Sequence, residues 1–131
     1  MSVLNIDLNN VQEPQPVPDG QYEVEVVGTP EIRTSQRSNQ EYINLRLQVV
    51  GEPTAADIYD IVMLPHQTED DTTNERRKLR LKRLCEAFGV EFAVGSIELE
   101  EFEGRRAGAL VTTENDEEYG DRNRIRRYLP I

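Results

Sequence analysis

The order of its periodic segments is the feature that most constrains how this chain can fold. Five segments show the alternation or the apolar run of a β-strand, at about residues 21–29, 41–50, 57–64, 105–113 and 122–129. A basic amphipathic helix is predicted at about residues 73–88, between the third and fourth of these segments. Three strands, one helix and two strands is the order of a five-stranded OB barrel. We therefore predict a mainly β fold with one helix, an OB-like barrel over residues 21–131.

Residues 1–20 are predicted to form an extended N-terminal arm outside the barrel. Three prolines within residues 13–18 exclude a helix there, and Asp19-Gly20 favours a turn into the first strand. The arm carries a short apolar set, Val3, Leu4, Ile6 and Leu8. We expect this set to dock on the arm's own barrel; the alternative is docking on a neighbouring chain, which would give a homo-oligomer.

The charges of the chain are separated along its length. The formal net charge is −10, which by itself argues against a nucleic-acid partner. Six basic residues nevertheless fall within residues 76–83, and four arginines without an acid fall within residues 122–127. Binding responds to the field of a local patch, so a basic surface on an acidic protein is compatible with this sequence. The helix cations could bind phosphates or an acidic partner, or pair with the chain's own acidic loops.

Several classes of protein are disfavoured by what the sequence lacks. No apolar run approaches the roughly 18 residues that span a bilayer, and the N-terminus has no signal-peptide pattern. We therefore expect a cytoplasmic protein without a membrane partner. Cys85 falls on the apolar stripe of the helix and is interpreted as a packing thiol. With His66 as the single histidine and no phosphate-loop spacing, we expect no enzyme, no metal and no cofactor.

The faces of the strands follow from their alternation. The second strand is the clearest, with Ile43, Leu45, Leu47 and Val49 on one face and Tyr42, Asn44, Arg46 and Gln48 on the other. The third strand is apolar on both faces, so the sequence does not decide which side Tyr59 occupies. In the last strand, Ile125 and Leu129 are assigned to one face and Arg124, Arg126 and Tyr128 to the other.

The ends of the predicted helix carry capping signals. Thr72 is predicted to cap the N-terminus, with Glu75 three residues later completing a capping box. Gly89 is predicted to cap the C-terminus. Elsewhere in the chain, residues 31–40 lie between the first two predicted strands. They are polar and are interpreted as a long hairpin loop.

Arginines and tyrosines recur where an OB fold holds its ligand, which is the face of strands 2 and 3 and two hairpin loops. Single-strand binding needs cations that follow phosphates and flat rings that stack on bases. The candidate residues are Arg33, Arg37, Tyr42, Arg46, Tyr59, Tyr119, Arg122, Arg124, Arg126 and Tyr128. The alternative interpretation of the same residues is a salt-bridged barrel surface.

Short runs spread over most of residues 18–129 carry a resemblance to a known family. They are Pro18-Asp19-Gly20-Gln21-Tyr22, Asn39-Gln40-Glu41-Tyr42-Ile43-Asn44-Leu45, Leu84-Cys85-Glu86-Ala87-Phe88-Gly89, Phe102-Glu103-Gly104-Arg105 and Asn123. In layout the chain resembles short phage-encoded proteins, catalogued as a domain of unknown function in replication and recombination modules. The resemblance implies an OB-like fold, a single-stranded DNA-binding role in phage replication, and a location in the host cytoplasm. The chain departs from well-known single-strand binders, which end in an acidic tail, because it ends Arg126-Arg127-Tyr128-Leu129-Pro130-Ile131.

Two functional hypotheses follow from these observations. The first is a sequence-tolerant single-stranded DNA-binding protein of phage-type replication or recombination, in contact with replication or recombination proteins. The second is an acidic protein-interaction or assembly module without nucleic-acid affinity. The second would use the arm or the basic helix to meet its partner.

Overall fold

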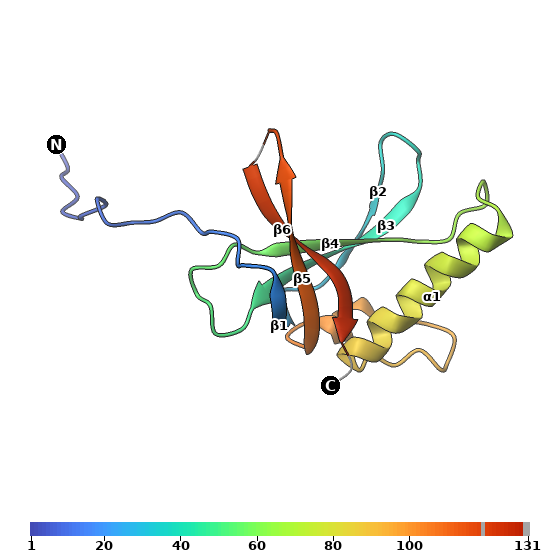
Figure 1. Ribbon diagram of the computed structural model, residues 1–131. Coiled ribbons are helices and arrows are strands. Elements are labelled where there is room, and N and C mark those ends of the chain that lie inside the picture. The colour runs from blue at the N-terminus through green and yellow to red at the C-terminus, as the bar shows by residue number, and fades with distance from the viewer. Residues whose placement is uncertain (119, 130–131) are drawn as a thin grey trace.

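The computed structural model describes residues 1–118 and 120–129, and the fold is mainly β with one long helix (Figure 1). The elements are β1 (Gly20–Val26), β2 (Glu31–Thr34), β3 (Glu41–Val49), β4 (Ile58–Met63), α1 (Asp71–Phe88), the 3-10 helix η1 (Leu99–Phe102), β5 (Arg106–Asp116) and β6 (Gly120–Leu129). Within the described ranges, the helix is not long and apolar enough to cross a membrane.

All neighbouring strands of the single sheet are antiparallel, and β3 lies at its centre. One edge of β3 pairs with β4. The other edge pairs with β2 at residues 41–44 and with β1 at residues 47–49. β1 also pairs with β5, and β5 with β6, so the order is β2-β3-β1-β5-β6 with β4 beside β3. The sheet is open, because no ladder joins β4 to β6 in the part of the chain that the structure describes.

The prediction of a five-stranded OB-like barrel is therefore wrong in strand number and order, and the sheet is not a closed barrel. The extra strand is β2, which lies in the segment predicted to be a loop. All four of its residues are exposed, so burial imposes no apolar alternation on them. Pairing with residues 41–44 alone makes this segment a strand.

The core lies between the inner face of the sheet and one stripe of α1. The predicted inward set on β3, Ile43, Leu45, Leu47 and Val49, is confirmed as buried. On β4, Ile58, Asp60 and Val62 are buried, which decides the question that the sequence left open, because Tyr59 and Ile61 then point outward. On α1, Leu84, Cys85 and Phe88 are buried, which confirms the predicted place of Cys85 on the apolar stripe of the helix.

The helix begins earlier than predicted and has a different cap. Asp70, not Thr72, is the N-cap, and its carboxylate accepts a 2.7 Å hydrogen bond from the backbone N–H of Thr73. This hydrogen bond is the main reason that the pKa of Asp70 is lowered. A carboxylate suits this place better than a hydroxyl, since it also meets the positive end of the helix dipole. The predicted cap at Gly89 is confirmed, with a left-handed φ of 69°.

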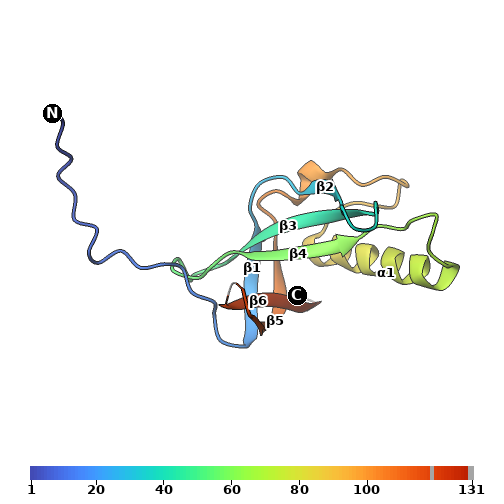
Figure 2. The same cartoon turned by 90° about the horizontal axis from the view of Figure 1, so that it is seen from above.

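The N-terminal arm is anchored at its base and free beyond it. Gln15 forms a β-bridge with Ala55, and Val17 is buried. The amide of Asn123 holds Val17 from both sides, accepting from its N–H at 2.8 Å and donating to its C=O at 2.9 Å. Residues before this anchor run away from the body on the side remote from α1 (Figures 1 and 2).

The expected docking of the arm on its own barrel is wrong. The four apolar residues that were expected to dock are 62–84% exposed, namely Val3, Leu4, Ile6 and Leu8. The apolar pattern predicts that these side chains pack against other apolar groups. It does not indicate whether those groups belong to the same chain or to another molecule.

Candidate nucleic-acid interface

The outer face of β2, β3 and β4 gathers four of the predicted binding residues. Arg46 on β3 lies directly opposite Tyr59 on β4, and Arg33 on β2 lies directly opposite Tyr42 on β3. Directly opposed side chains of an antiparallel pair point to the same side of the sheet, and Tyr42 and Arg46 are four residues apart on one strand. Tyr59 is 56% exposed, so its ring is available to a ligand. We call these four residues the outer face.

Both arginines of the outer face have acidic neighbours. Arg33 pairs with Glu31 at 3.1 Å, and Arg46 pairs with Asp57 at 2.7 Å. The hydrogen bond to Asp57 is the main cause of the raised pKa of Arg46. Ion pairs on a wet surface add little stability, because water and salt screen the charges. An arriving phosphate can therefore replace these carboxylates.

Three further predicted arginines lie on two hairpins, β2–β3 and β5–β6, which project on the same side of the molecule (Figure 1). Arg37 is exposed in the turn between β2 and β3. On β6, Arg122 pairs with Asp116 at 3.5 Å and Arg124 with Glu114 at 3.0 Å. Tyr119, the aromatic residue predicted for this second hairpin, lies outside the described residues.

The structure separates Arg126 and Tyr128 from the outer face. Ile125 is opposite Val111 and Arg127 is opposite Leu110, so Arg126 is an extra residue in β6. This bulge reverses the faces of the strand beyond Ile125. The prediction that Arg124, Arg126 and Tyr128 share one outward face is therefore wrong, because the bulge turns Tyr128 inward. A single extra residue leaves no signal in a sequence that still alternates on both sides of it.

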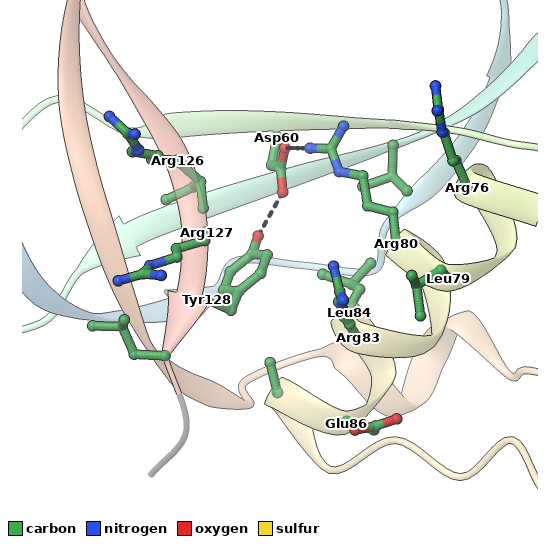
Figure 3. Close-up of a pocket in the computed structure, with 14 residues that line it drawn as sticks. Asp60, Arg76, Leu79, Arg80, Arg83, Leu84, Glu86, Arg126, Arg127 and Tyr128 are labelled. Carbon is green, nitrogen blue, oxygen red and sulfur yellow. Dashed lines mark hydrogen bonds and ion pairs between the residues drawn. The ribbon is translucent and has the colours of Figure 1, made fainter. Parts of the chain in front are cut away.

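Tyr128 occupies the seam between β4 and β6. Its hydroxyl donates a 2.7 Å hydrogen bond to Asp60, which also accepts one of 2.8 Å from Arg80 of α1 (Figure 3). The ring packs edge-on against Phe88, with centroids 5.2 Å apart. Burial, and then the nearby Asp60 carboxylate, raise the pKa of Tyr128 well above its ordinary value. Side chains thus join β4, β6 and α1 where no strand ladder does.

A cleft of about 750 Å³ opens beside this seam, between α1, β4 and β6. Its lining includes aliphatic side chains, among them Val62, Leu79, Leu84, Ile125 and Leu129. Five arginines also line it, Arg76, Arg80 and Arg83 from α1 and Arg126 and Arg127 from β6. We call it the arginine cleft. Figure 3 shows Arg126 and Arg127 directed away from α1, so they form an outer rim.

The five arginines of the cleft differ in their ion pairing. Arg80 is bonded to Asp60, whereas the other four arginines form no ion pair with a described residue. The sequence showed two basic runs about forty residues apart but gave no sign that they meet, and Arg127 was not predicted as a site residue.

The fold and these two surfaces define a small β-protein with one helix, an exposed sheet face with arginines and tyrosines, and an arginine-rimmed cleft. The chain belongs to the family DUF669, described as a protein of unknown function, whose family model matches residues 4–128. This match confirms the resemblance to an uncharacterised domain family. No curated protein matches the chain.

Proposed function

We propose that this protein binds single-stranded DNA without strong sequence preference, in phage-type DNA replication or recombination. The observation that carries the proposal is the outer face, where an arginine is set directly opposite a tyrosine in two registered cross-strand pairs. Guanidinium groups neutralise phosphates, and rings stack on any base, so this combination suits a strand of arbitrary sequence.

An OB-like interpretation of the sheet supports the proposal. β1 and β2 pair with the same edge of β3, so they can be regarded as one strand that is bent at residues 27–30. The sheet then has five strands, with the helix between the third and the fourth. β4 faces β6 across a seam bridged by Asp60 and Tyr128. A partly open barrel of five strands is the OB architecture, and we propose that this sheet corresponds to it.

The position of the outer face agrees with this interpretation. OB folds bind oligonucleotides on strands 2 and 3 and on the loops that join strands 1 to 2 and 4 to 5. With β1 and β2 merged, those strands are β3 and β4, and those loops are the tips of the β2–β3 and β5–β6 hairpins. The bound DNA strand would cross Tyr42, Arg46 and Tyr59, with Arg37 and Arg122 contacting it from the two hairpins.

The test is fluorescence anisotropy of a labelled dT oligonucleotide titrated with the full chain. Tyr59→Ala is expected to weaken binding by about 1–3 kcal/mol, roughly 5- to 150-fold, because one stacked base is lost. Tyr59→Phe keeps the ring and is expected to bind as the unaltered chain does. Equal affinity for all three proteins would remove the outer face from the proposal.

The second candidate function is an acidic assembly module without affinity for nucleic acid. The observations that favour it are the net charge of −10 and the carboxylate partners of Arg33 and Arg46. Absence of dT binding even at low salt would support this function over the first.

A further inference from the structure

The N-terminal arm holds six of the eleven large hydrophobic residues that are exposed in the described part of the chain. Five of its large apolar side chains are 62–84% exposed, Val3, Leu4, Ile6, Leu8 and Val11. Leu4, Ile6 and Leu8 alternate, so in an extended chain they form one aliphatic edge. Residues 1–14 contain two acids, Asp7 and Glu13, and no basic side chain. An aliphatic and acidic segment of this kind is complementary to an aliphatic and basic groove.

The arginine cleft has that chemistry. Aliphatic side chains contribute to its lining, and one of them, Leu79 on α1, is 44% exposed. Four of its lining arginines form no ion pair with a described residue, Arg76 and Arg83 on α1 and Arg126 and Arg127 at the outer rim on β6. The acid of its lining on β4, Asp60, is already bonded to Arg80 and Tyr128. The remaining lining acid is Glu86, so the rim is strongly positive.

The lining of the cleft suits a peptide better than a nucleic acid. Aliphatic side chains offer bases no flat surface on which to stack. The ring among the lining residues, Tyr128, packs edge-on against Phe88 and gives its hydroxyl to Asp60. The occupant should therefore bring aliphatic groups for the lining and a carboxylate for the rim.

We propose that the arginine cleft holds residues 3–8 of the N-terminal arm of a second copy of this chain, with Asp7 facing the rim arginines. The arm leaves its own body on the side remote from α1 (Figures 1 and 2), which favours a neighbour over its own cleft. Ile6 is nine residues before Gln15, so an extended arm reaches about 30 Å beyond its anchor. Reciprocal exchange of two arms would close a dimer. This inference is independent of the proposed DNA face.

The experiment measures self-association of the full chain by sedimentation equilibrium over a range of concentrations. The arm variant combines Ile6→Asp with Leu8→Asp, and the cleft variant combines Arg83→Glu with Arg127→Glu. Each is expected to weaken self-association at least tenfold. Their 1:1 mixture is expected to form a heterodimer, because one protein retains a good cleft and the other a good arm.

Matched controls separate this contact from a general effect of charge. Asn5→Asp with Asn10→Asp adds the same charge to the arm but keeps its aliphatic edge. Lys78→Glu with Arg106→Glu reverses two exposed basic side chains that do not line the cleft. Both controls are expected to associate as the unaltered chain does. A fluorescent peptide of residues 1–12 should bind the arm variant and not the cleft variant, which guards against misfolding of either.

Three outcomes would overturn the inference. The unaltered chain could be monomeric at every concentration, for example because the arm binds the cleft of its own chain. The dimer could persist in both variants. The cleft variant could lose dT binding but keep its self-association, which would assign the cleft to nucleic acid. Failure of the proposed DNA function alone would appear as absent dT binding with self-association intact.

Discussion

Asp60 links β4 to β6 and α1 at the open side of the sheet. It is 5% exposed, and its two carboxylate oxygens accept from Arg80 and Tyr128. In the sequence, Asp60 shows only as one acidic residue within the apolar run of β4. That pattern does not indicate that the carboxylate is buried or which groups it accepts hydrogen bonds from. Replacing it should leave the Tyr128 hydroxyl buried without a partner, whereas the half-exposed Arg80 can turn to water.

Asp60→Ala is therefore expected to lower the free energy of unfolding by about 2–3 kcal/mol, mainly through the unpartnered hydroxyl. Asp60→Asn, which keeps one acceptor oxygen, should cost less. Urea unfolding followed by circular dichroism measures both. A loss below about 0.5 kcal/mol for Asp60→Ala would mean that the seam does not hold β4 and β6 together.

Tyr128 gives the seam a dependence on pH. The pKa of Tyr128 is raised well above its ordinary value of 10.0 in the folded protein, so the folded state keeps this proton longer than the unfolded chain does. Its contribution to stability is complete below about pH 10 and falls as the pH rises from there toward the folded pKa, by up to about 1.4 kcal/mol per pH unit. Tyr128→Phe should remove this part of the decline. Unfolding free energies at about pH 9 and about pH 11 test the difference, and parallel declines would contradict it.

At the scale of elements, the sequence predicts well where burial is one-sided. The alternation of β3, the stripe of α1 and the cap at Gly89 each follow from a single local rule, and the structure has all three. β2 was missed because its residues are all exposed, and the inward turn of Tyr128 because a bulge obeys no periodicity. The arginine cleft could not be predicted, since it depends on the docking of α1 beside β6.

The bulge of β6 leads to a prediction about deletions. Removing Arg126 leaves Ile125 opposite Val111 and Tyr128 opposite Ala109, so the inward faces survive and the loss of stability should stay within about 1 kcal/mol. Removing Arg124, a neighbouring arginine of the same strand, would bring Arg126 into the place of Ile125. That deletion should cost more than about 2 kcal/mol. Thermal unfolding of the two shortened proteins checks the order, and equal losses would argue against the bulge.

At the scale of the molecule, an acidic protein with local basic surfaces should bind a polyanion weakly and with a strong dependence on salt. Each phosphate neutralised on a single strand contributes about −0.7 to the slope of log affinity against log salt. Arg46→Gln should therefore reduce the steepness of the slope by about 0.7. Arg106→Gln is the matched control, because Arg106 is also ion-paired and its side chain is 54% exposed against 53% for Arg46, but it pairs with acids of β1. Equal slopes for both variants would place the DNA elsewhere.

The two hydrogen bonds between the Asn123 side chain and the backbone of Val17 determine how far a protease can shorten this chain from its amino end. Residues 1–14 can be removed without breaking these hydrogen bonds. A cut beyond Val17 would break both and leave the Asn123 side chain, among the described residues, its 3.4 Å contacts to Thr112 and Thr113. Limited digestion should therefore stop near residue 14, at a fragment that mass spectrometry identifies. If the arm is held by a second copy, the same digestion should slow as the protein is concentrated, so that the rate of trimming reports the association.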